Sequence, residues 1–173
     1  MKIKDSDIEV FILKPDNSLN LFLFTGTDYG LSCTRFNNLI SSFKIDQEDP
    51  FNCSRIEQKD LENNSAILVD DALKISFNQK IRTIIIKLYG DKLPLNVLNA
   101  IKLLLKSLPI KNTKIFILAQ NLSSSSSLVK LISEDKYSAV ISSYQSSGKK
   151  IQDKIKLMLS KENVTITNNA LNL

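Results

Sequence analysis

Residues 19–36 constrain the fold of this chain most strongly, because they predict a strand, a tight turn and a helix in immediate succession. The apolar run at 21–24 is typical of a strand that is buried on both faces. Gly26 and Gly30 bracket the turn, and a helix is expected from about Gly30 to Phe43. This order of elements is the one with which nucleotide-binding α/β units begin.

The turn lacks the side chains that hold a nucleotide. A phosphate-binding loop has the pattern G-x-x-x-x-G-K-[ST], in which backbone N–H groups and a lysine bind the phosphates and a hydroxyl binds Mg²⁺. Here Gly26, Thr27, Asp28 and Gly30 form a loop one residue too short, Leu31 replaces the lysine, and Asp28 adds negative charge. We expect a degenerate loop with no cofactor, whose glycines serve backbone geometry. Residual anion binding at the helix N-terminus is the alternative.

The strand ends provide a second argument against ATP hydrolysis. An ATPase of this class holds Mg²⁺ with an acidic residue at the end of a core strand. The strands expected at 81–88 and 113–119 end in Ile86-Lys87-Leu88 and Ala119-Gln120-Asn121, without an acid. The chain also has no histidine, which removes histidine general-base catalysis. We therefore expect no intrinsic catalysis.

Two further pairs of reactive side chains have structural interpretations. Asp70 and Asp71 are neighbours on a predicted helix, so their side chains point about 100° apart and form no catalytic dyad. We expect both carboxylates on a solvated helix face. Cys33 and Cys53 lack the spacing of a metal site, and we expect two buried free thiols.

The charge balance leaves a DNA-binding alternative open. The net charge of +5 comes mostly from lysine, because the chain has only three arginines. Few arginines provide few bidentate contacts to phosphate or guanine. A lysine-rich face on the helix predicted at 149–160 could still contact phosphates, through Lys149, Lys150, Lys154 and Lys161.

Strand and helix signals alternate along the rest of the chain, which favours an α/β domain with a mostly parallel sheet. Further strands are expected at 51–58, 81–88, 113–119 and 137–143, with the strand at 81–88 central because it is apolar on both faces. Further helices are expected at 66–74, at 94–106, after the serine run at 123–127, and after a capping box formed by Ser6 and Glu9. Residues 60–64 are expected to form a loop.

Neither a membrane span nor a signal peptide is indicated. No apolar run reaches the roughly 20 residues that a membrane-spanning helix needs. Asp5, Asp7 and Glu9 interrupt the N-terminus where a signal peptide would be apolar. We therefore expect a cytoplasmic protein.

The segment after the helix predicted at 66–74 places apolar side chains between polar neighbours. Ile75 and Phe77 stand in the run LKISFNQK at 73–80. The Phe77 ring can fold back under the sheet edge, or it can fill the pocket of a partner protein. The residues alone leave both hypotheses open.

Four segments, taken in order, resemble the N-terminal part of the delta subunit of bacterial DNA polymerase III, the clamp-loader subunit that opens the sliding clamp. They are LFLFTGTDYGL with its helix, DPFNCSRIEQKDL at 49–61, ALKISFNQKIRTIIIK at 72–87 and IFILAQNLSSSSSLVKLISE at 115–134. The resemblance covers most of residues 19–145. It implies a RecA-like, AAA+-like parallel five-stranded sheet flanked by helices, with a degenerate P-loop.

The resemblance also implies a domain organisation and partners. Residues 1–144 would form the RecA-like, clamp-binding domain, and residues 145–173 would begin a helical lid domain. The collar domain that joins the family's subunits into a ring would be absent. The implied partners are the sliding clamp (the beta subunit) and other clamp-loader subunits, with DNA contacted only indirectly or weakly.

The resemblance implies that an apolar pair, typically Leu-Phe in the family, is inserted into a pocket of the clamp. The pair comes from the turn after the helix predicted at 66–74. Aligned without a gap, the pair falls on Phe77 and Asn78, whereas a one-residue deletion makes Phe77 its second member. The resemblance thus implies a clamp-binding set of Leu73, Ile75, Phe77 and Asn78, with Ile75 and Phe77 as anchors and Leu73 as support. A P-loop nucleotide-binding or ATPase protein and a lysine-based DNA-binding module remain the alternatives.

Overall fold

The computed structural model describes residues 1–76, 80–144, 156, 159 and 164. The chain divides into two compact units, Met1–Ser143 and Tyr144–Leu173. Phe77 and Asn78 lie outside the described residues, as do the predicted DNA contacts Lys149, Lys150, Lys154 and Lys161. Every helix and strand named below belongs to the first unit.

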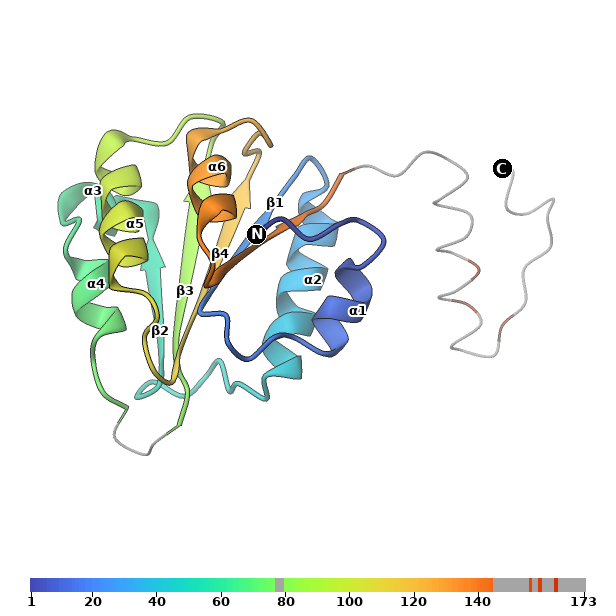
Figure 1. Ribbon diagram of the computed structural model, residues 1–173, viewed down its shortest axis with the longest axis horizontal. Helices are drawn as coiled ribbons and strands as arrows, with labels where there is room; N and C mark the ends of the chain where they lie inside the picture. The colour runs from blue at the N-terminus through green and yellow to red at the C-terminus, as the bar shows by residue number, and fades with distance from the viewer. Residues whose placement is uncertain (77–79, 145–155, 157–158, 160–163, 165–173) are drawn as a thin grey trace. The chain divides into compact units, whose positions relative to one another are not determined.

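The first unit is built on a five-stranded sheet in which all paired strands are parallel (Figure 1). The strand order is β2-β3-β4-β1-β5, which leaves β3, β4 and β1 in the interior of the sheet. The strands are β1 (Leu21–Thr25), β2 (Cys53–Glu57), β3 (Arg82–Tyr89), β4 (Thr113–Gln120) and β5 (Ser138–Ser142). The predicted parallel sheet is therefore confirmed, including the interior position of β3.

The strands are buried on both faces, so the sheet carries two separate cores. In β1, Leu21 and Leu23 point to one core, whereas Phe22 and Phe24 point to the other. This alternation follows from the two-residue period of a strand. It explains why β1 is a continuous apolar run rather than an alternating one.

Six helices among the described residues cover the two faces (Figure 1). Helices α1 (Ile8–Leu13) and α2 (Tyr29–Ser42) pack over one core. Helices on the other face are α3 (Gln58–Asn63), α4 (Ile67–Ala72), α5 (Leu95–Ser107) and α6 (Ser127–Glu134). The helices on both faces explain how a parallel sheet avoids exposing an apolar surface.

The core beneath α1 and α2 is rich in phenylalanine. Phe22 of β1 stacks on Phe116 of β4, with 5.3 Å between the ring centroids. Phe36 and Phe43, from α2 and the residue after it, meet the Phe116 ring edge-on. These rings hold α2 against the centre of the sheet and thereby fix the loop that precedes this helix.

Three predictions of local structure were wrong. Residues 58–63 form helix α3 rather than a loop, and the Asp60 carboxylate accepts a hydrogen bond from the Glu57 amide at 2.9 Å. The Ser6–Glu9 capping box does not form, because Asp7 is the N-cap of α1 and the Ser6 hydroxyl donates to its carboxylate. Phe51 lies before β2 rather than within it.

Candidate functional site

The loop that follows β1 is a tight turn whose first glycine is required. Gly26 has a φ of +137°, and a Cβ added there would lie 1.9 Å from the carbonyl oxygen of Ser143. The Asp28 amide donates to that same carbonyl at 3.1 Å. The end of β5 therefore packs directly against the loop. Gly30, by contrast, lies inside α2, and a Cβ there would meet nothing closer than 3.7 Å.

The N-terminus of α2 is capped by the chain itself. Asp28 is the N-cap, and its carboxylate accepts a hydrogen bond from the Leu31 amide at 2.8 Å. The Ser32 amide donates to the Asp28 carbonyl at 3.0 Å. These backbone donors are the kind that hold phosphate in a working phosphate-binding loop. Here a carboxylate takes the place that an anionic ligand would need.

No acidic residue ends either of the two strands that could hold Mg²⁺ beside this loop. Strand β3 ends at Tyr89 and β4 ends at Gln120. Among the described residues, no three His, Cys, Asp or Glu side chains gather closely enough to hold a metal ion. Both cysteines are free thiols, but they are half-buried rather than buried. Burial raises the pKa of the Cys53 thiol.

The second candidate site lies at the other end of the strands, which we call the amino edge of the sheet. We call residues 73–81, which join α4 to β3, the α4–β3 segment. Because the strands are parallel, the loop after β1 lies at their carboxyl ends and the α4–β3 segment at their amino ends. Ile75 is 96% exposed and Leu73 is 56% exposed, so neither side chain folds back into the core. Phe77 and Asn78, the pair expected to enter a pocket of the clamp, belong to this segment but lie outside the described residues.

A buried carboxylate anchors the beginning of the segment. Asp71 was predicted on a solvated face, but its side chain is buried and accepts three hydrogen bonds. The donors are Arg82 at 2.6 Å, Lys74 at 2.9 Å and the Ser54 hydroxyl. Burial pushes the pKa of Asp71 upward, but hydrogen bonds from Ser54 and Lys74 and the Arg82 guanidinium outweigh it, so the pKa lies below its usual value. The prediction was wrong because the partners of Asp71 on β2 and β3 cannot be seen from the helix alone.

The loop before β2 is joined to the same segment. The Ser76 hydroxyl donates to the side-chain carbonyl of Asn52. The Asn52 amide group donates in turn to Asp49 at 2.9 Å, and Lys80 lies 3.4 Å from the same carboxylate. The described ends of the segment are therefore bonded to α4 through Asp71 and to the loop before β2 through Asn52 and Asp49.

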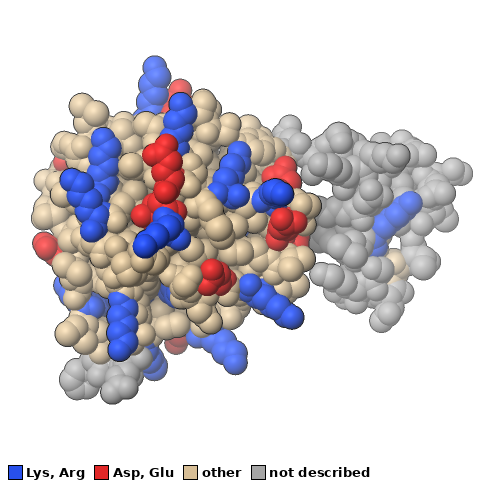
Figure 2. Space-filling view, in the orientation of Figure 1, with Lys and Arg blue, Asp and Glu red and all other residues tan. Residues whose placement is uncertain are grey.

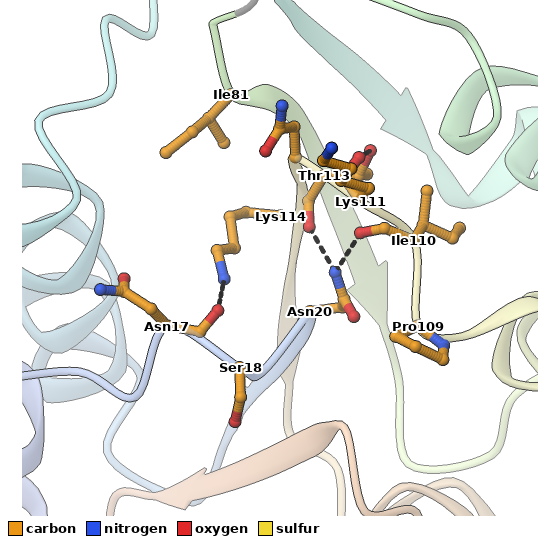
Figure 3. Close-up of a pocket in the computed structure, with 10 residues that line it drawn as sticks. Asn17, Ser18, Asn20, Ile81, Pro109, Ile110, Lys111, Thr113 and Lys114 are labelled. Carbon is orange, nitrogen blue, oxygen red and sulfur yellow. Dashed lines mark hydrogen bonds between the residues drawn. The ribbon is translucent and has the colours of Figure 1, made fainter.

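A pocket of about 500 Å³ opens at the amino edge of the sheet (Figure 3). The buried Lys114 ammonium donates to the carbonyl oxygens of Asn17 at 2.7 Å and Leu19 at 2.5 Å, and burial lowers its pKa. Asn20 donates from its amide to the carbonyls of Ile110 and Thr113. These polar groups hold the strand ends together, which gives them a structural role.

Charge is not gathered on the visible face of the molecule. Figure 2 shows Lys and Arg side chains spread over the described surface, with acidic side chains among them. A protein that binds the phosphate backbone of DNA usually carries a continuous basic patch. No helix among the described residues is long and apolar enough to cross a bilayer.

Solved structures share this fold. The chain matches the DNA clamp loader delta protein (YqeN) of Bacillus subtilis with a TM-score of 0.65 and 18% identity, over 96% of this chain and 50% of that one. It matches a RuvB variant of Thermotoga maritima with a TM-score of 0.51 and 12% identity, over 96% and 51%. The chain thus spans about half the length of these proteins. No curated protein sequence matches the chain.

The five-stranded parallel sheet with helices on both faces is the fold of AAA+ proteins. The family model of the DNA polymerase III delta subunit matches residues 22–145, more than half of the chain. The chain belongs to this family, and the resemblance drawn from its sequence is confirmed. It is a relative of the delta subunits of clamp loaders.

Proposed function

We propose that this chain is a non-catalytic, cytoplasmic clamp-loader module that binds the sliding clamp and favours its open form. Membership of the delta family supports the proposal. The observation that carries it is the 96% exposure of Ile75 on a segment that buried side chains hold in place. An apolar side chain that is exposed but held in position is suited to fill a partner's pocket.

The proposed binding surface consists of Leu73, Ile75, Phe77 and Asn78. Ile75 and Phe77 serve as anchors, Leu73 supports them from the end of α4, and Asn78 helps to set the register. Burying one phenylalanine ring stabilises a complex by about 1.5–3 kcal/mol. An unpaired Asn78 amide beside it would cancel part of that gain.

Opening follows from differential binding. A ligand shifts a conformational equilibrium only by its difference in affinity for the two states. The chain would therefore bind the open conformation of the clamp more tightly than the closed one. This mechanism requires no nucleotide. The loop after β1 agrees with it, because the Asp28 carboxylate accepts the Leu31 amide that could otherwise bind phosphate, and Leu31 stands in place of the phosphate-binding lysine.

A binding titration tests the proposal. The affinity of the chain for its cognate clamp is measured without nucleotide, for the wild type, Ile75→Ala and Phe77→Ala. We expect nucleotide-independent binding that weakens at least about tenfold in each variant. Unchanged affinity in both variants would show that the assigned surface is wrong.

Two other functions make different predictions. A nucleotide-binding protein of the P-loop type would release heat on titration with ATP. A DNA-binding module acting through Lys149–Lys161 would lose affinity steeply with added salt. Contacts with other clamp-loader subunits belong to the proposal as well.

A further inference from the structure

Phe51 is the one phenylalanine among the described residues whose ring is mostly exposed. Its exposed fraction is 76%, whereas five other rings lie in the core beneath α1 and α2 and Phe11 packs against that core. Exposed aromatic rings are enriched among the side chains that contribute most to protein interfaces. The Phe51 ring is therefore a candidate contact residue.

The backbone of Phe51 is fixed although its ring is exposed. The Asp49 carboxylate accepts a hydrogen bond from the Phe51 amide at 3.0 Å. The Arg82 guanidinium donates to the Phe51 carbonyl at 2.8 Å. Both polar groups of the Phe51 backbone are thus paired, which reduces the ordering cost that the residue incurs on binding.

The same side chains that hold Phe51 also hold the α4–β3 segment. Arg82 binds the Phe51 carbonyl through one nitrogen and the Asp71 carboxylate through another. The residues next to Phe51 and Ile75 in the chain, Asn52 and Ser76, are joined by a side-chain hydrogen bond. The two exposed apolar residues therefore lie on neighbouring, mutually braced loops at the amino edge of the sheet.

We propose that Phe51 is a second apolar anchor of the clamp-binding surface, which contacts the same partner as Ile75 and from a different loop. The inference rests on the proposed function. The occupant is the clamp rather than a second copy of this chain, because hydrogen bonds join the loop of Phe51 to the segment that carries Ile75, the clamp anchor of the proposed function. Two anchors from two loops fix the orientation of the partner, which a single plug cannot do.

Phe51→Ala and a matched control test the inference. Leu95 is also 76% exposed, but it begins α5, after β3, at the opposite edge of the sheet. Phe51→Ala is expected to weaken clamp binding about tenfold, while Leu95→Ala changes it by less than about twofold. Both side chains are exposed, so both variants are expected to keep the wild-type melting temperature.

The outcomes separate this inference from the proposed function. If Ile75→Ala weakens binding and Phe51→Ala does not, the second anchor is wrong and the clamp-binding function stands. If the wild type fails to bind the clamp, both fall. If Phe51→Ala instead abolishes self-association in sedimentation experiments while clamp affinity is unchanged, the occupant is a second copy and the inference is overturned.

A spectroscopic probe provides an independent readout. The chain contains no tryptophan, so Phe51→Trp labelled with 5-fluorotryptophan gives a single ¹⁹F resonance. Addition of unlabelled clamp is expected to shift this resonance, and the same label at Leu95 is expected to stay unchanged. An unshifted resonance at position 51 under saturating clamp would contradict contact.

Discussion

Asp71 and Arg82 form a buried ion pair, with 2.6 Å between a carboxylate oxygen and a guanidinium nitrogen. The pair joins the end of α4 to the first residue of β3, and a second Arg82 nitrogen reaches the carbonyl of Phe51. One side chain thus connects the end of α4, the beginning of β3 and the loop before β2. The exposed residues of the candidate site are positioned by this buried charge.

Asp71→Asn is expected to destabilise the fold by about 3 kcal/mol, because it leaves the Arg82 charge buried without its counter-ion. Urea unfolding at pH 7 measures the change. Lys74→Ala is the matched control, since Lys74 is bonded to the same carboxylate but its side chain is 63% exposed. Its effect is expected to stay below about 1 kcal/mol. Equal effects of the two variants would contradict the role given to Arg82.

The same carboxylate predicts a pH dependence. The pKa of Asp71 is lowered in the folded protein, so between the folded value and the unfolded value of about 3.9 the unfolded chain binds more protons. The stabilisation is therefore fully present above the unfolded pKa and is lost as the pH falls through the folded pKa. Urea midpoints between pH 6 and pH 3 should decline less steeply in Asp71→Asn than in the wild type. If the urea midpoints of the two proteins decline in parallel, Asp71 does not contribute to the pH dependence of stability.

Gly26→Ala is expected to destabilise the protein by at least about 2 kcal/mol, because its φ of +137° and the Ser143 carbonyl leave no room for a Cβ. Gly30→Ala is the control. Gly30 lies in helix α2, where an added Cβ would make an ordinary contact with the Asp28 carboxylate at 3.7 Å, so alanine there should be neutral or stabilising by up to about 1 kcal/mol. Thermal melting compares the two. A tolerated Gly26→Ala would mean that the loop does not need this backbone geometry.

Leu31→Lys is expected not to create an ATP site. The substitution restores the missing lysine, but the Asp28 carboxylate still caps α2 where phosphate would bind. Calorimetric titration with Mg-ATP should give no heat of binding for the wild type or the variant. Micromolar affinity in the wild type would revive the nucleotide-binding alternative.

The core of the fold could be predicted from the sequence because its signals are local. Apolar runs such as 21–24 and 84–86 are long enough to be buried on both faces, and the structure places them in β1 and β3. The serine run predicted the N-cap of α6, where Ser126 accepts from the Val129 amide. The helix α3 was missed because its six residues, QKDLEN, bury only Leu61 and carry little periodicity.

The candidate site was harder to predict because its order comes from contacts distant in sequence. Nothing near Asp71 indicates that Arg82 and Ser54 will surround it, since those residues arrive from β3 and β2. Phe51 was expected within a strand because side chains alternate along residues 51–58. The turn signal of Asp49-Pro50 was the one local indication that the ring stands outside the sheet. The exposure of Ile75 agrees with its polar neighbours, which the sequence does show.

Opening of the clamp ring tests the central claim most directly. A fluorescent donor and acceptor placed across one interface of the cognate clamp report its separation when this chain is added without nucleotide. We predict that energy transfer falls in the presence of the wild type and stays high with Ile75→Ala. Energy transfer that remains unchanged at wild-type concentrations that saturate the clamp would contradict the proposal that the chain opens it.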